Sequence, residues 1–257
     1  MIGGFAFLYV PLLTMVLFSF NASRLQTVWG GFSTRWYWEL VQDPEVIQAA
    51  ILTVKIAGLS ATIATVIGVL SAFALARFQR FGGRGGFSLM VTAPLVVPEV
   101  VIGFSSLMLF IYMAEFIGWP ARRGFTTITL VHATFATAFV TILVQSRLAG
   151  TAREAEDAAA DLGARPMAVF LEITIPSILP AVISGWLLAF TLSIDDVVLA
   201  TFTTGPGSTT LPIYIWSKVK FGVTPEINAL ASVMIGVVAL AALVAALLMS
   251  RSRKSIE

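Results

Sequence analysis

The sequence predicts an all-α, polytopic membrane protein, and three observations support this fold class. Of the 257 residues, 58% are hydrophobic and only 12% are charged, whereas soluble domains carry about 25% charged residues. Mean hydropathy is +0.91. The apolar runs are long and continuous, as in helices that use about 20 residues to cross a bilayer, rather than alternating as in a membrane β-barrel. We therefore expect a single transmembrane domain over residues 1–257.

Six apolar segments predict six spans, with both termini on the same side of the membrane. They are Gly3–Phe20, Ala49–Ala76, Phe87–Met113, Phe125–Gln145, Ser177–Thr203 and Ile227–Met249. The first span has no basic start and no small-residue cleavage site, so we expect it to be retained rather than removed as a signal peptide. The sequence starts abruptly at this span, which is consistent with a missing cytoplasmic leader before it. The Trp-rich connector over residues 21–47 suits a membrane interface.

The composition excludes several kinds of chemistry. The chain has no cysteine, which rules out disulfides, thiolate metal sites and thiol catalysis. Its one histidine, His132, leaves no imidazole cluster for a metal, and we expect it to be a hydrogen-bonded packing residue. None of the four lysines follows a glycine, so there is no Walker A motif and ATP must be hydrolysed elsewhere if it drives this protein. A net charge of +2 gives no argument for nucleic acid as a partner.

The stretch Thr151–Pro176, which we call the central loop, is the one long segment that is both charged and patterned as helix. Thr151 and Glu154 have the spacing of a capping box, and five alanines follow within ten residues. Gly163 predicts a left-handed helix stop, and Pro166 suits the first turn of a second helix. The stretch therefore predicts a short helix with little side-chain bulk, a sharp turn and a second helix.

The distribution of basic residues predicts which side of the membrane this stretch occupies. The loops on its side contain nine basic residues: Arg77, Arg80, Arg84, Arg147, Arg153, Arg165, Arg251, Arg253 and Lys254. The opposite loops contain six: Arg24, Arg35, Arg122, Arg123, Lys218 and Lys220. Basic residues are enriched in cytoplasmic loops, so we expect the central loop and both termini to be cytoplasmic.

Three carboxylates fall inside predicted spans, namely Glu99, Asp195 and Asp196. A carboxylate at membrane depth is costly and usually faces a cavity or a partner. Two prolines just before Glu99 would free backbone carbonyls, which indicates a water-lined path. These acids are therefore candidates for a substrate path. The alternative is structural, with the aspartates bonded to a kinked backbone or paired with Lys55 or a neighbouring subunit.

The central loop resembles the EAA loop of ABC importer permeases. In that family Glu-Ala-Ala is followed by three residues, Gly, nine residues and Ile-x-Leu-Pro. Here the same spacing is filled by Asp157, Ala158, Ala159, Gly163 and the segment Ile173–Pro176. There are two departures, Asp for Glu at 157 and Ile for Leu at 175. Longer segments, including PLVVPEVVIGFSSLMLF (residues 94–110) and residues 176–216, resemble the permease subunits of spermidine and putrescine importers.

The resemblance implies a type I importer (MetI-like) fold in a bacterial inner membrane, with an EAA coupling loop at about residues 147–176. It implies a non-catalytic subunit that forms a polyamine path together with a second permease. The other implied partners are a periplasmic binding protein and a pair of ATPase subunits, which would hold ATP and Mg²⁺, so that this chain needs no cofactor. The implied ATPase-coupling residues are Glu156, Asp157, Ala158, Ala159, Gly163 and Pro176.

Other functions stay open at this point. Ferric iron, phosphonate, thiamine or an opine-like amine are alternative substrates within the same class. A self-sufficient secondary transporter or channel would need internal symmetry and ion-coupling residues, and neither is evident. A membrane enzyme is the weakest reading, because only scattered carboxylates remain to carry chemistry.

Overall fold

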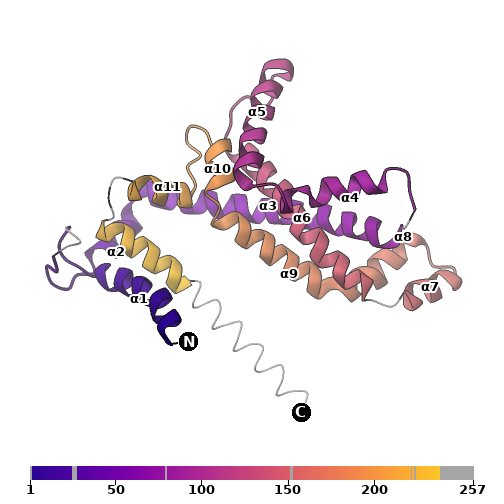
Figure 1. Ribbon diagram of the computed structural model, residues 1–257, viewed down its shortest axis with the longest axis horizontal. Helices are drawn as coiled ribbons and strands as arrows, with labels where there is room; N and C mark the ends of the chain where they lie inside the picture. Colours follow the sequence, from indigo (N-terminus) through magenta and orange to yellow (C-terminus); the bar gives the residue numbers. More distant parts are fainter. Residues whose placement is uncertain are drawn as a thin grey trace, which may run out of the picture. The chain divides into compact units, whose positions relative to one another are not determined.

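The computed structural model describes residues 2–24, 28–78, 80–150, 153–220, 222 and 224–237. Within these ranges the fold is helical, apart from an isolated antiparallel bridge between Asn21 and Phe32. The α-helices labelled in Figure 1 are α1 (Ile2–Phe18), α2 (Arg35–Gln42), α3 (Pro44–Arg77), α4 (Arg84–Thr92), α5 (Glu99–Ile117), α6 (Phe125–Ala149), α7 (Glu154–Asp161), α8 (Pro166–Val169), α9 (Ile175–Ile194), α10 (Val198–Thr203) and α11 (Leu211–Val219). Two short turns complete the list: the 3₁₀ turn η1 (Ala93–Leu95) follows α4, and the π turn η2 (Phe170–Thr174) joins α8 to α9. A further apolar helix covers Pro225–Val237.

Among the residues that the structure describes, four helices are long and apolar enough to cross a membrane. They are Pro44–Arg77, Glu99–Ile117, Phe125–Ala149 and Pro166–Ile194, the last combining α8, η2 and α9. They correspond to the second to fifth predicted spans. The first and sixth predicted spans coincide with shorter apolar helices, and residues 238–249 of the sixth lie outside the described ranges.

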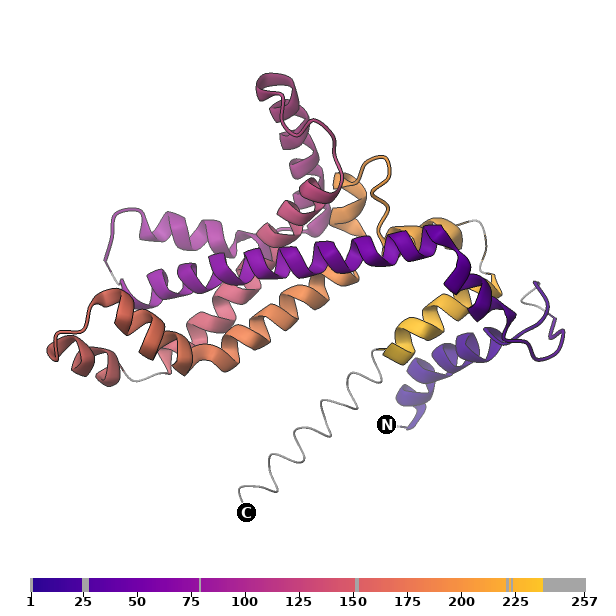
Figure 2. The same ribbon diagram turned by 180° about the vertical axis from the view of Figure 1, so that it is seen from behind.

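The third predicted span, Phe87–Met113, is interrupted at Pro94 and Pro98, as these two prolines indicate. α4 ends at Thr92, one 3₁₀ turn follows, and α5 begins at Glu99. Proline lacks an N–H and disfavours the helical conformation in the residue before it, so Pro94 and Pro98 end one helix and start another. α5 turns away from the direction of α4 at this break (Figures 1 and 2).

The fifth predicted span, Ser177–Thr203, is discontinuous as well. α9 ends at Ile194 and α10 begins at Val198, so the two aspartates occupy a break instead of a continuous helix. Aspartate side chains compete for backbone N–H groups and favour helix starts over helix interiors, which is the physical reason for the break here.

The chain divides into two compact units, Met1–Gln48 with Tyr214–Glu257, and Ala49–Ile213. In the first unit the side chain of Asn21 is buried and organises the connector after α1. Its Nδ2 donates to the Val28 carbonyl (2.9 Å), and its Oδ1 accepts from the Gly30 N–H (2.8 Å). The indole of Trp36 donates to the Asn21 carbonyl (2.7 Å), which places this tryptophan inside the unit rather than at an outer surface.

The core of the second unit lies between α3, α6 and α9. Its buried side chains are Ala61, Ala64, Val69, Ala72, Ala136, Val140, Val144, Leu148, Ile178 and Ala189. Val140 of α6 lies between two glycines: a Cβ on Gly68 of α3 would be 2.7 Å from its Cγ1, and one on Gly185 of α9 would be 3.2 Å away. Small residues at these two points let three membrane helices approach closely. Such close packing is common in membranes, because burying apolar side chains gives little driving force for helix association when lipid is equally apolar.

Candidate functional site

The central loop has the predicted helix–turn–helix form. α7 covers Glu154–Asp161 and α8 begins at Pro166, which is the expected first-turn proline. The predicted capping residue Thr151 lies outside the described ranges. Downstream, α8 continues through the π turn into α9, so the loop leads into a membrane helix without an intervening coil.

Gly163 ends α7 as the sequence predicts. Its φ is +84°, and its N–H donates to the Ala160 carbonyl (2.9 Å) while the Ala164 N–H donates to the Ala159 carbonyl (3.0 Å). These two bonds are the Schellman pattern, in which a left-handed glycine satisfies the last free carbonyls of a helix. Pro166, three residues after Gly163, starts α8, so the direction of the second helix is set within a few residues of the turn.

The acidic side chains of α7 divide into an inward and an outward group. Glu156 faces the protein, where its carboxylate pairs with the Arg77 guanidinium (Oε1 to Nη2, 2.8 Å). Asp157 and Ala158 are exposed and Ala159 is half-buried. Glu156, which the family resemblance implies as an ATPase-coupling residue, is thus paired with Arg77 of the same chain.

Three large apolar side chains close in sequence to the turn after α7 are exposed. Leu162 is 90% exposed, and Met167 and Leu171 are 67% and 55% exposed.

Pro176, the last residue of the loop motif, lies in the first turn of α9 directly after the π turn, where the Ile175 N–H donates to the Phe170 carbonyl. Because Pro176 has no N–H to donate, the helix widens at this point without losing a bond that it could otherwise make.

The structure brings the three candidate carboxylates together at the two helix breaks. Glu99 is the first residue of α5, and Asp195 and Asp196 follow the end of α9. The helices that follow the two breaks, α5 and α10, pack against each other. Glu99 and Asp195 are exposed, whereas only 8% of the Asp196 side chain is exposed. Glu99 and Asp195 are therefore more accessible than Asp196 to a molecule that reaches the helix breaks.

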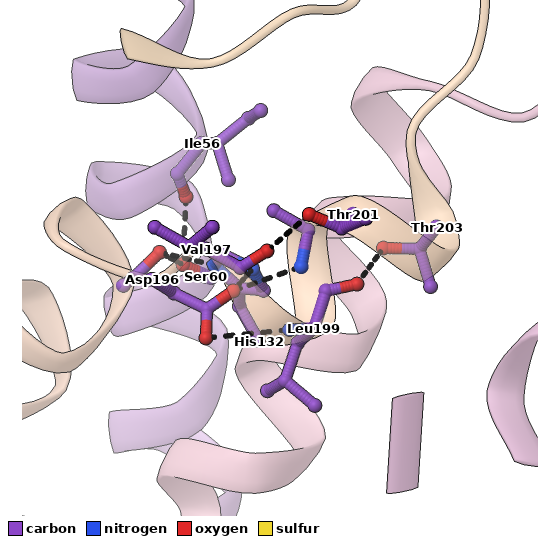
Figure 3. A network of polar contacts seen from close by, with 10 residues as sticks. Ile56, Ser60, His132, Asp196, Val197, Leu199, Thr201 and Thr203 are labelled. Carbon is purple, nitrogen blue, oxygen red and sulfur yellow. Dashed lines mark hydrogen bonds and ion pairs between the residues drawn. The ribbon is translucent and has the colours of Figure 1, made fainter. Parts of the chain in front are cut away.

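Asp196 belongs to a buried polar network that joins four helices (Figure 3). Its Oδ1 accepts from the Ala200 N–H (2.8 Å), so it caps the start of α10. The same oxygen lies 3.2 Å from Nε2 of His132 on α6, in a contact that does not reach hydrogen-bond geometry. Nδ1 of His132 is 2.7 Å from the Ser193 hydroxyl of α9, which in turn accepts from the Ser60 hydroxyl of α3 (3.0 Å).

The network confirms His132 as a hydrogen-bonded packing residue, since its side chain is 3% exposed and bonded to Ser193. Sequence reasoning did not find Ser60 or Ser193, whose signal is only a hydroxyl in an otherwise apolar run. Among the described residues, no group of three or more His, Cys, Asp or Glu side chains could hold a metal ion.

The comparisons with known proteins agree with this fold. The family described as "Binding-protein-dependent transport system inner membrane component" matches residues 64–257. The chain is 53% identical to the putrescine transport system permease protein PotI of Escherichia coli K12 over 98% of its own length and 89% of that protein. It is 43% identical to the spermidine/putrescine transport system permease protein PotC of Haemophilus influenzae, over 96% and 93% of the two chains.

Solved structures have the same fold at low identity. A bacterial alginate ABC transporter, crystallised with a pentasaccharide-bound periplasmic protein, superposes with a TM-score of 0.73 at 19% identity, covering 97% of this chain and 90% of that one. The fold is thus that of an ABC importer permease. The chain belongs to the family of binding-protein-dependent transport system inner membrane components.

Proposed function

We propose that this chain is a transmembrane permease subunit of an ATP-driven polyamine importer. The observation that carries the proposal is 53% identity over 98% of the chain to a putrescine permease. The acidic helix break supports it, because an amine leaving water needs fixed negative groups in exchange for its hydration. The subunit forms the path with a second permease and receives substrate from a periplasmic binding protein.

ATP and Mg²⁺ belong to a separate pair of ATPase subunits, which dock on the central loop. The exposed residues Asp157, Ala158 and Leu162 make the contact, and the low bulk of the alanines lets α7 enter a groove closely. Gly163 sets the angle at which the chain leaves α7, and Pro176 sets the direction in which α9 begins. Glu156 contributes from inside the permease, through Arg77.

The loop faces the cytoplasm in this proposal. Within the second unit, the end that carries the loop holds six basic residues: Arg77, Arg80, Arg84, Arg147, Arg153 and Arg165. The connectors at the opposite end hold two, Arg122 and Arg123. Six basic residues against two is a stronger asymmetry than the nine against six counted over the whole chain. Because basic residues favour the cytoplasmic side, this end of the unit is assigned to the cytoplasm.

Glu99 and Asp195 contact the substrate amine, and Asp196 braces the break. The first two are exposed at the junction, whereas Asp196 is committed to the α10 N–H groups and to His132. Non-helical backbone at this depth also leaves carbonyls free to accept from an ammonium group.

ATPase stimulation tests the proposal. The subunit is reconstituted with its partner permease, ATPase and binding protein, and ATP hydrolysis is measured with putrescine, spermidine, ferric iron, phosphonate or thiamine. We expect stimulation by the polyamines alone. Stimulation by one of the other compounds, and none by polyamines, would replace the proposed substrate class.

A further inference from the structure

Arg77, the last residue of α3, makes a two-pronged contact with the central loop. Its Nε donates to Oε2 of Glu156 (2.9 Å) and its Nη2 donates to Oε1 (2.8 Å). The two side chains are 8% and 13% exposed, so the pair is largely removed from water. Paired parallel bonds between a guanidinium and a carboxylate fix orientation as well as distance.

The pair also reaches two other membrane helices. Nη1 of Arg77 donates to the Leu148 carbonyl at the end of α6 (3.3 Å). Oε1 of Glu156 accepts from the hydroxyl of Thr174, which is buried in the π turn leading into α9 (3.0 Å). One ion pair therefore connects the ends of three helices of the membrane core to α7.

α7 needs such an attachment because none of its residues is buried. Apolar packing, which orients most helices, is thus weak here, and the helix orientation depends on specific polar contacts. Lysine could not replace Arg77, since a single ammonium cannot present the planar fork that contacts both carboxylate oxygens and the Leu148 carbonyl.

We propose that Arg77 and Thr174 are positioning residues for energy coupling, which hold α7 through Glu156 so that a displacement of the loop moves α3, α6 and α9 together. The inference rests on the proposed function and deepens it. It assigns coupling to Arg77, which lies outside the central loop, and to Thr174, which occupies the variable position of the Ile-x-Leu-Pro segment. It also gives Glu156 an internal role in place of a contact with the ATPase.

The test uses the full reconstituted importer in proteoliposomes, with radiolabelled putrescine uptake and ATP hydrolysis measured on the same preparation. Arg77→Gln and Glu156→Gln should each lower the amine transported per ATP about tenfold, with the assembled complex still co-purifying. The double variant should lose no more than either single variant, because both remove one shared contact. Arg80→Gln, an exposed arginine three residues further on, is the matched control and should behave as wild type.

Thr174 provides a milder second variant should the charge changes prevent assembly. Thr174→Val removes the hydroxyl at almost constant volume and should lower transport per ATP about threefold, whereas Thr174→Ser should retain it. A purely structural role would reduce the yield of complex and leave transport per ATP at the wild-type value in every variant; that result overturns the inference. Absence of putrescine uptake by the wild-type complex would instead contradict the proposed function.

Discussion

At the scale of single residues, the two adjacent aspartates differ in environment, and this difference predicts different variants. Asp195 is exposed in the helix break, so Asp195→Asn should lower putrescine uptake about tenfold, equivalent to roughly 1.4 kcal/mol, with assembly unchanged. Uptake by proteoliposomes, with assembly checked by co-purification, is the measurement. Wild-type uptake by both Asp195→Asn and Glu99→Gln would remove these carboxylates from the path.

Asp196→Asn should affect stability more than transport. The Asp196 carboxylate caps α10 and lies against buried His132. Replacing the carboxylate by a neutral amide weakens the cap on α10, because hydrogen bonds to charged groups contribute about 1.5–3 kcal/mol and those between neutral groups about 0.5–1.5 kcal/mol. We expect a lower midpoint of thermal unfolding in detergent, with uptake per folded complex close to wild type. An unchanged midpoint combined with lost uptake would move Asp196 into the path.

Gly163 tests the turn of the coupling loop. At φ +84° a β-branched residue is strained, so Gly163→Val should disturb the angle after α7 and reduce ATP-driven uptake with insertion intact. Space is not the reason, because an added Cβ would meet no atom within 4 Å. Gly163→Asn is the matched control, since asparagine tolerates the left-handed region. Equal uptake by the Val and Asn variants would show that the turn conformation does not matter for coupling.

At the scale of helices, the contact between α3 and α6 depends on Gly68. A methyl group there would lie 2.7 Å from Val140 Cγ1, so Gly68→Ala should destabilise the protein by about 1–3 kcal/mol. Gly58→Ala on the same helix is the control, because a Cβ there meets no atom within 4 Å. Adding Val140→Ala to Gly68→Ala should restore part of the loss, as judged by thermal unfolding. No rescue would mean that the two helices do not meet as described.

The helices also mark how far the sequence predicts this structure. Local signals sufficed for the α7 turn, because Gly163 and Pro166 act within one turn of the chain. The prolines and aspartates indicated kinks, yet the length of each break depends on which backbone groups find partners in the folded protein. The Arg77–Glu156 contact spans 79 positions and the Ser60–Ser193 contact 133, so neither leaves a local pattern.

At the scale of the whole molecule, the proposed topology is testable because the chain contains no cysteine. Cysteines introduced at exposed positions Gly82 and Thr209 should label from opposite sides of the membrane. Thr209→Cys should react with an impermeant reagent in intact cells, and Gly82→Cys only after permeabilisation. The reverse pattern would place the central loop outside the cell, beyond the reach of a cytoplasmic ATPase.

Putrescine uptake by the complete complex is the most direct test of the proposed function. Proteoliposomes contain this subunit with its partner permease and ATPase, ATP is enclosed on the ATPase side, and loaded binding protein is added outside. We expect accumulation of radiolabelled putrescine that requires ATP, the binding protein and this subunit together. Accumulation that persists without ATP or the binding protein, or no accumulation with all components present, would contradict it.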